Sequence, residues 1–354
     1  MDEAGDIAGI SIPFTAGVAA GVALSGAAAP LSAVSLLASS LLLVRASSGR
    51  MGRAGMALVY SCLGLFCASS RVLMPGGGGG GFLTTLALKA VERLRAAIDA
   101  LPLAHRSSNA LICALLTGDR SGLDSPLTQT FRAAGASHIL ALSGLHLGVI
   151  YLIVSRCLSI LGRSRPALWA RSATTVLAAG FYTLMTGAGP SIVRAFLFIL
   201  ISEGCRLSPG RSRSPARTLL CVLMIQLVLD PEVITSLGFQ LSYLAMAGIT
   251  FVFPWMDGWY PEGKGPVRKV WQSAALTLSC QVFTAPLVWI RFHSFPKYFL
   301  ITNLVALPLT SGIMGACVCT LALHALGICP EMLLQACDTL VQSLVFCLEV
   351  IASL

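Results

Sequence analysis

The chain has 354 residues, of which 56% are hydrophobic and 11% are charged, and its formal net charge is +9. A soluble domain carries about 25% charged residues, so this chain has too few polar side chains to cover a surface that faces water. The composition excludes an ordinary soluble protein and indicates a polytopic membrane protein.

The N-terminal residues and the cysteines narrow the class further. The chain begins MDEAGDIAGISIPF, with acidic residues where a secretory signal carries Lys or Arg, so we expect this segment to stay uncleaved. The 12 cysteines are scattered, mostly inside apolar runs, and form no CxxC pair. Buried cysteine behaves as a small hydrophobic residue, so we expect no disulfide framework.

Apolar runs of about 15 to 20 residues predict membrane-spanning helices, and we expect about 11 of them in an all-α, polytopic helix bundle. They lie near residues 9–24, 31–45, 54–73, 136–155, 171–187, 190–206, 216–230, 234–254, 270–290, 298–325 and 331–353. Pro308 lies inside the long tenth run and can break it into two shorter pieces.

The positive charge is concentrated in three loops between these runs. The loops contain Arg45, Arg50 and Arg53; Arg156, Arg163, Arg165 and Arg171; and Arg206, Arg211, Arg213 and Arg217. They follow the second, fourth and sixth runs and therefore lie on one side, which the positive-inside rule identifies as the cytoplasm. The charge thus needs no polyanionic partner, and the odd number of spans puts the C-terminus outside.

Residues 76–134 form the one sizeable segment between spans, and the same alternation places it outside. It begins with Gly76–Gly81, a flexible linker by composition. The stretch LTTLALKAVERLRAAIDALPLAHR then alternates apolar and charged residues at helical spacing, which predicts an amphipathic helix on the membrane or on the bundle. Two further short helices are expected at Asn109–Thr117 and Pro126–Ala134, separated by the turn-like GDRSGLDS.

The stretch 131–152, FRAAGASHILALSGLHLGVIYL, combines an apolar span with two histidines and several small residues. On a single helix with about 100° per residue, Ser137, Gly144, Gly148 and Ser155 share one stripe, and His138, Ser143, His146 and Gly135 share the opposite arc. Small residues allow close helix packing, so Gly144 and Gly148 are predicted packing positions. Polar groups at membrane depth face a bundle interior or a wet cavity, so the histidine arc is a candidate site or a set of buried hydrogen-bonded residues.

Polar residues recur in four later spans. Gly189-Pro190 predicts a helix start, and Arg194 follows one turn inside an apolar run, where it needs an anion, carbonyls or water, or reaches the nearby surface. Gln240 and Asn303 lie on polar faces of two other spans, and the ninth span carries a polar stripe of Ser273, Thr277, Gln281 and Thr284. Each alone is typical of contacts between helices, but together they predict a shared polar lumen.

Enzymatic chemistry is not expected. Ser143 and His146 are three residues apart, which suggests a Ser-His hydrolase, but the base would have to come from another helix and no GxSxG motif is present. The sequence has no HExxH metal motif and no GxxxxGK[ST] loop for ATP. We therefore expect no enzyme activity, no metal and no cofactor.

These motifs resemble the ComEC family of competence proteins, the inner-membrane channels for DNA uptake in natural transformation. The segments that carry the resemblance are FRAAGASHILALSGLHLGVIY (131–151), GPSIVRAFLF (189–198), LDPEVITSLGFQLSYLAMAGI (229–249) and TNLVALPL (302–309). By this match, His138, Ser143, Gly144 and His146 belong to the family's signature segment. Pro190, Arg194, Gln240, Ser242 and Asn303 match its other characteristic positions.

The resemblance implies a multi-pass permease of the bacterial inner membrane that passes single-stranded DNA into the cytosol. It implies membrane lipids as surroundings, with a separate nuclease and a cytosolic ATP-driven helicase as partners. Family members often carry an OB-like domain and a metallo-β-lactamase-like domain, and neither pattern is found here. The implied divisions are N-terminal spans (1–75), an external linker with amphipathic helices (76–134) and a permease core (135–354).

The predicted lumen also fits other classes of protein. A small-molecule or lipid permease would use the same polar path. A hydrolase based on Ser143 would be labelled by a serine-reactive probe. Loss of DNA uptake in cells without the gene would separate the DNA channel from the other permeases.

The predicted orientation can be tested by cysteine labelling. In a chain without native cysteines, a cysteine at Ser164 or Ser212 should resist an impermeant thiol reagent added to intact cells, because both positions are in loops predicted to face the cytoplasm. A cysteine in the Gly76–Gly81 run should react. The reverse labelling pattern would contradict the orientation.

Overall fold

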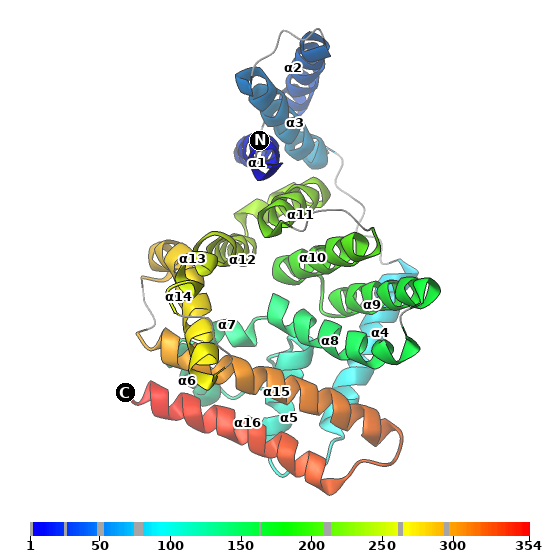
Figure 1. Cartoon of the computed structure of the whole chain (residues 1–354), viewed down its shortest axis with the longest axis vertical. Helices are drawn as coiled ribbons and strands as arrows, with labels where there is room; N and C mark the ends of the chain where they lie inside the picture. Colours follow the sequence, from blue (N-terminus) through cyan, green and yellow to red (C-terminus); the bar gives the residue numbers. More distant parts are fainter. Residues whose placement is uncertain are drawn as a thin grey trace. The chain divides into compact units, whose positions relative to one another are not determined.

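The computed structural model describes residues 3–24, 27–47, 53–73, 81–162, 164–208, 214–260, 265–293 and 297–354. Every regular element within these ranges is helical, which confirms the all-α fold class (Figure 1). The glycine linker, apart from Gly81, lies outside the described residues, as do Arg50, Arg163, Arg211 and Arg213 of the basic loops.

The helices follow one another with short connections. In chain order they are α1 (Glu3–Ala23), α2 (Ala28–Ser47), α3 (Arg53–Leu73), α4 (Phe82–Asp99), α5 (Arg106–Thr117), α6 (Ser125–Ala133), α7 (Ser137–Leu140), α8 (Gly144–Cys157), η2 (Leu158–Leu161), α9 (Arg165–Met185), α10 (Pro190–Leu207), α11 (Pro215–Leu229), η3 (Pro231–Thr235), α12 (Leu237–Ala247), η4 (Gly248–Val252), α13 (Phe253–Asp257), α14 (Pro266–Phe292), α15 (Phe299–Ala325) and α16 (Glu331–Ala352).

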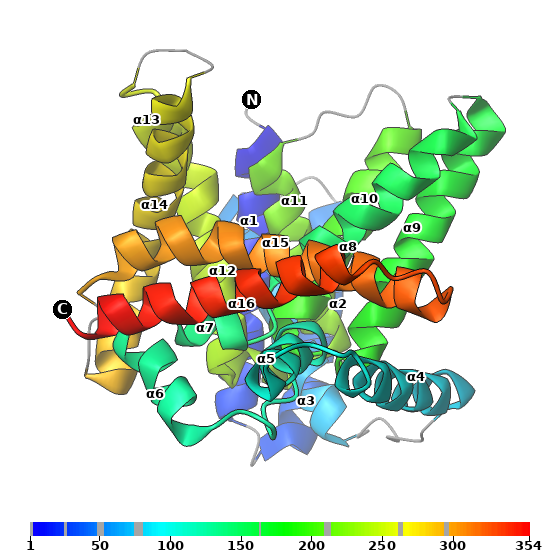
Figure 2. The ribbon, with the colours of Figure 1, turned by 90° about the horizontal axis from the view of Figure 1, so that it is seen from below.

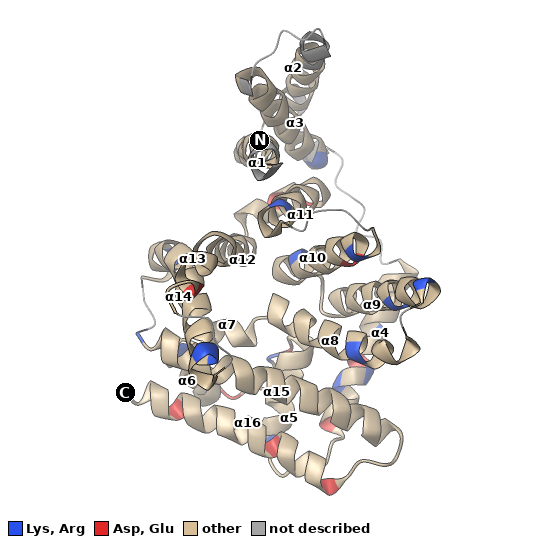
Figure 3. Cartoon of the chain, in the orientation of Figure 1, with Lys and Arg blue, Asp and Glu red and all other residues tan. Residues whose placement is uncertain are grey.

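Six stretches within the described ranges are helical, long enough and apolar enough to cross a membrane. They are Ala54–Arg71, Gly144–Leu161, Leu237–Asp257, Pro266–Phe292, Phe299–Ala325 and Glu331–Ala352. Shorter apolar helices lie at Ile7–Ala23, Pro30–Leu42 and Pro215–Leu229. Charged residues occupy few positions on the helices, as Figure 3 shows. The total of 11 spans stays a prediction.

The chain divides into two compact units that are discontinuous in sequence. Unit 1 comprises residues 1–79 and 208–250, and unit 2 comprises residues 80–207 and 251–354. These units group residues by packing, and the three consecutive divisions expected from the sequence stay a prediction.

Close packing of α1 against α3 organises unit 1. A Cβ at Gly17 would overlap the Ser61 carbonyl, and a Cβ at Gly64 would overlap the Phe14 carbonyl. Only glycine permits the two backbones to approach this closely. Helices in lipid gain little from the hydrophobic effect, so close packing supplies the attraction between them. Residues of α11, η3 and α12 complete a small apolar cluster with α1 and α3.

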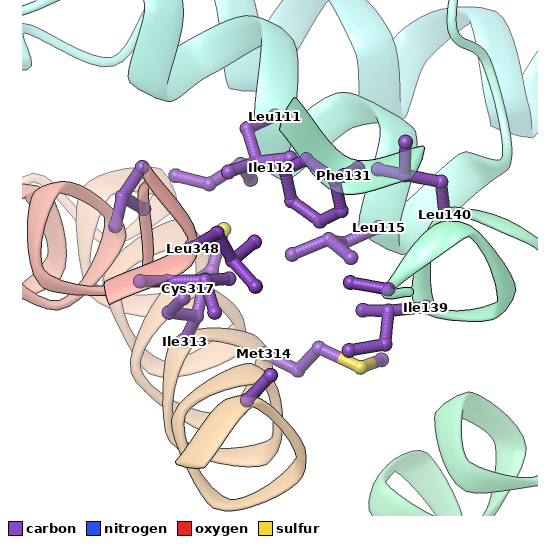
Figure 4. Packing of buried hydrophobic residues seen from close by; sticks show 14 of the residues in the cluster. Leu111, Ile112, Leu115, Phe131, Ile139, Leu140, Ile313, Met314, Cys317 and Leu348 are labelled. Carbon is purple, nitrogen blue, oxygen red and sulfur yellow. The ribbon is translucent and has the colours of Figure 1, made fainter. Parts of the chain in front are cut away.

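The core of unit 2 joins the short helices α5, α6 and α7 to α15 and α16. Figure 4 shows the cluster: Leu111, Ile112 and Leu115 of α5 and Phe131 of α6 point toward Ile313, Met314 and Cys317 of α15 and Leu348 of α16. α15 and α16 lie side by side along their lengths (Figures 1 and 2). The short helices expected between the spans are therefore built into the bundle.

Several predicted helices are confirmed. The amphipathic helix is α4, the two short helices are α5 and α6, and Pro190 begins α10. α15 continues through Pro308 as one helix, so the tenth span is not broken into two pieces.

The turn after α5 depends on Gly118. Its φ of 79° is left-handed, and its N–H caps α5 by donating to the Ala114 carbonyl. A Cβ at this position would lie 2.5 Å from Leu142 Cδ1 and 2.9 Å from Leu142 Cγ. Gly118 therefore makes room for the segment that joins α7 to α8.

Gly118→Ala should destabilise the protein by about 1–3 kcal/mol, because it adds both left-handed strain and a steric overlap. The measurement is the thermal unfolding temperature in detergent, with Gly122→Ala as the matched control. A Cβ at Gly122 meets Ala110 Cβ at 3.4 Å, an ordinary contact. Equal unfolding temperatures for the two variants would contradict the assignment.

Candidate functional site

The candidate site is a break in the chain between α7 and α8. α7 ends at Leu140, and α8 begins at Gly144 with Ser143 as its N-cap. Ser143 Oγ accepts a hydrogen bond from the Leu145 N–H at 3.2 Å, and the Ser143 N–H donates to His146 Nδ1 at 3.1 Å. This is a capping box in which histidine takes the position usually held by Glu or Gln.

The expected single helix over 136–155 is therefore wrong. Ser137 and His138 belong to α7, and Gly144, His146 and Gly148 belong to α8, so the two stripes do not continue across the break. The physical reason is that Ser143 bonds the first turn of α8 with its side chain, which requires extended backbone at that residue.

His146 is buried, with 1% of its surface exposed. Since its Nδ1 accepts the Ser143 N–H, the proton of the neutral ring is assigned to Nε2. Nε2 is buried and has no hydrogen-bond partner within the described residues. The ring therefore offers one hydrogen-bond donor.

The Ser143–His146 contact is shared with the start of α8. Ser143 Oγ lies 3.0 Å from His146 Nδ1, but both atoms also bond backbone N–H groups of the same helix start. A nucleophile needs a base whose acceptor nitrogen is free for its proton. The contact is accounted for by helix capping.

The break is held in place from neighbouring elements. Arg120 Nε donates to the Leu140 carbonyl at 3.0 Å, which satisfies the end of α7. Thr302 Oγ1 of α15 donates to the Ala134 carbonyl at 2.7 Å, just before α7. A buried backbone carbonyl without a partner is costly, so these bonds stabilise a non-helical segment inside the unit.

Arg194 of α10 is buried and lies against the start of α8. Its NH2 atom is 3.1 Å from the position that a Cβ would take at Gly144, and Ala195 Cβ is 3.4 Å from the same point. Arg194 is also near enough to the Cys280 thiol of α14 to interact with it electrostatically. A guanidinium thus lies near the positive end of the α8 dipole.

The two glycines predicted as packing positions have different surroundings. Gly144 has these close neighbours from α10, whereas a Cβ at Gly148 would meet nothing within 4 Å. The structure gives Gly144 a close helix contact and leaves open space at Gly148.

His138 lies on the exposed side of α7, where its Nδ1 is 3.2 Å from the Gly135 carbonyl. It is close enough to His146 to interact with it electrostatically. The break thus brings His138, Ser143 and His146 together, with Arg194 beside the same helix start.

The other two candidates lie on other helices. Gln240 belongs to unit 1, where its Nε2 donates to the Ile234 carbonyl at 2.8 Å. Asn303 of α15 is half-buried, and its Oδ1 has no hydrogen-bond partner within the described ranges. Thr310, two turns further along α15, also has a buried Oγ1 that has no hydrogen-bond partner within the described ranges. Within the described residues, α15 therefore carries one polar side-chain atom without a hydrogen-bond partner before Pro308 and one after it.

Glu203 forms a set of polar contacts between three helices, called the Glu203 joint below, and these contacts were not predicted from the sequence. Its carboxylate accepts hydrogen bonds from Tyr151 Oη at 2.7 Å and Ser172 Oγ at 2.6 Å, and it pairs with Arg206 Nε at 3.3 Å. These contacts join α8, α9 and α10. A carboxylate in an apolar run was the available signal, but its partners lie on other helices.

A second unpredicted cluster joins α5 to α16. Asp338 accepts from Ser108 Oγ at 2.6 Å and lies 2.8 Å from His105 Nδ1, and Gln342 Nε2 donates to Ser108 Oγ at 3.1 Å. The carboxylate is buried, and the lone Asp in the last apolar run was its only signal. No group of three or more His, Cys, Asp or Glu able to hold a metal occurs within the described residues.

These features define a helical membrane protein with buried polar groups beside a broken helix. A family model described as Competence protein matches residues 115–354. The chain belongs to this family, which confirms the resemblance drawn from the motifs.

Curated relatives match a little over half of the chain. ComE operon protein 3 of Bacillus subtilis is 27% identical over 202 residues, 57% of this chain and 24% of its own length. Competence protein ComA of Neisseria gonorrhoeae is 29% identical over 211 residues, which are 58% of this chain and 29% of the relative's length. The uncharacterized protein YcaI of Escherichia coli is 28% identical over 209 residues, which are 57% of this chain and 27% of the relative's length. The matches thus span about a quarter of each relative. No solved structure matches.

The two glycines of α8 provide a matched test of this geometry. Gly144→Leu should lower the folded yield and stability by about 1–3 kcal/mol or more, because a large side chain overpacks the contact with Arg194 and Ala195. Gly148→Leu should be tolerated. The measurement is folded yield and unfolding temperature of both variants in the same detergent, and similar losses would contradict the assigned packing.

Proposed function

We propose that this chain forms part of a path that carries single-stranded DNA across the bacterial inner membrane into the cytosol during natural transformation. Membership of the competence protein family and the names of two relatives support a role in competence. The observation that carries the proposal for DNA is the position of Arg194 at the start of α8.

Two sources of positive potential meet at that point. The N-terminus of a helix carries about half a positive charge, and its first N–H groups point outward along the axis. The guanidinium of Arg194 beside it adds a full charge, and this side chain is buried. An arrangement of this kind favours an anion, and phosphate is the anion that helix starts and arginines bind most readily.

The nearest acidic residue in the same helix is already engaged. Glu203 is bonded to Tyr151, Ser172 and Arg206. His146 Nε2 and the neutral acceptors of α15 supply hydrogen bonding without further charge. A path with one strong cation and otherwise neutral groups can bind a phosphate backbone without trapping it.

We propose that the chain acts as a permease without its own catalytic step. The Ser143–His146 contact is a helix cap, and strand degradation and ATP-driven pulling are assigned to separate partners, a nuclease and a cytosolic helicase. We propose that the protein lies in the bacterial inner membrane as a multi-pass protein, a proposal that its bacterial relatives and its apolar helices support.

Arg194→Gln should reduce DNA transport about tenfold or more, because hydrogen bonds to a charged group contribute about 1.5–3 kcal/mol. The measurement is uptake of a fluorescent single-stranded oligonucleotide into vesicles that contain the purified protein, scored as DNA protected from added nuclease. Arg291→Gln, an exposed arginine at the end of α14, is the matched control and should transport normally.

His146→Gln separates capping from transport. Glutamine at this position still completes a capping box, so the unfolding temperature should stay near that of the wild type while transport falls. A large loss of stability would instead make His146 a structural residue. Uptake of a small neutral solute without DNA would favour the small-molecule or lipid permease.

A further inference from the structure

The helix α4 changes character along its length. Its first two turns expose large apolar side chains, with Phe82 82% and Leu88 57% exposed and Leu83 and Leu86 also exposed. The second half exposes charged residues such as Glu92 and Asp99. Burial of apolar surface contributes about 25 cal/mol per Å², so an apolar partner that covers these side chains would stabilise the start of the helix.

The opposite side of α4 is fixed to unit 2. Ala87, Val91 and Ile98 are buried, and the helix packs against α5 and α9. Asn109 Nδ2 of α5 donates to the Ile98 carbonyl at 2.7 Å. The exposed apolar residues therefore cannot turn inward without loss of this interface.

An ion pair holds the second half of α4 in the same orientation. Arg95 NH1 lies 3.2 Å from Asp119 Oδ2. The Ser121 N–H donates to Asp119 Oδ1 at 3.0 Å, and this hydrogen bond lowers the pKa of the Asp119 carboxyl. The carboxylate is thus charged at neutral pH and available to Arg95.

Along the exposed side of α4, the residues change from apolar to cationic. At about 100° per residue, Phe82, Leu86, Lys89 and Arg93 follow one another along the side opposite Val91. Apolar side chains prefer the hydrocarbon of a bilayer, and Lys and Arg prefer the phosphates at its surface. The order of these residues fits a helix whose start dips into lipid.

The surface around α4 favours lipid over another protein. α9, against which α4 packs, also exposes apolar side chains, with Leu177 72% and Leu184 42% exposed, so both helices present apolar side chains that lipid can cover. A second copy of the chain paired in parallel along this line would bring Lys89 and Arg93 against their own counterparts, and like charges repel.

We propose that residues 82–88 of α4 insert into one leaflet of the bilayer, while Lys89 and Arg93 bind the phosphate groups of anionic phospholipids. α4 then acts as an anchor that fixes the level of the short helices α5 and α6 relative to the membrane surface. This inference concerns the membrane and does not depend on the transported molecule.

Photo-crosslinking tests the insertion directly. p-Benzoylphenylalanine in place of Phe82 or of Glu92 is compared in vesicles whose phosphatidylglycerol carries radiolabelled acyl chains. The Phe82 position should take up several-fold more label than the Glu92 position, which is exposed on the charged half of the same helix. Equal labelling, or adducts at Phe82 between protein chains, would overturn the proposal.

The headgroup contact is tested by changing the charge of the lipid, the salt concentration and the two cations in turn. Crosslinking from position 82 should be higher in phosphatidylglycerol vesicles than in phosphatidylcholine vesicles at low salt, and the difference should disappear at high salt. The double variant Lys89→Glu with Arg93→Glu should remove the difference at low salt as well. Labelling that is independent of lipid charge would contradict the binding of phosphate by Lys89 and Arg93.

Discussion

The structure of unit 2 depends on satisfying the backbone where α7 stops and α8 starts. Inside a membrane protein, a helix that ends leaves carbonyl and N–H groups that water cannot reach, so each must find a partner in the protein. Ser143 and His146 bond the start of α8, and Arg120 bonds the Leu140 carbonyl at the end of α7. Gly118 provides the space that lets the joining segment pass. Because these bonds are made, a helix start with its positive end can exist within the bundle and face a guanidinium.

Much of the fold follows from patterns that are local in sequence. The spacing of Val91 and Ile98 against charged residues predicts α4, and Pro190 predicts the start of α10 because proline suits a first helical turn. The break at Ser143 was missed for an equally local reason. Residues 136–155 are mostly apolar, and the capping signal there is S-x-x-H rather than S-x-x-E, so the run gives the pattern of one continuous span.

The polar residues of the candidate site could be identified from sequence, but their partners could not. Arg194 stands out because an arginine is costly in an apolar run, yet its position beside Gly144 results from the packing of α10 on α8. Gln240 matches the family pattern equally well and bonds the turn next to its own helix. Glu203 draws its bonds from α8 and α9, 52 and 31 residues away. Such pairings depend on helix order in space, which periodicity does not encode.

The Glu203 joint also restricts how the protein can move. One carboxylate bonds Tyr151 of α8, Ser172 of α9 and Arg206 of its own helix, so sliding any of these helices would leave a buried charge without its bonds. The three helices are therefore expected to shift as one rigid block in any conformational change of unit 2. A hinge for that block would have to lie outside it, and the break between α7 and α8, where Ala141 and Ser143 have extended backbone, borders the block directly.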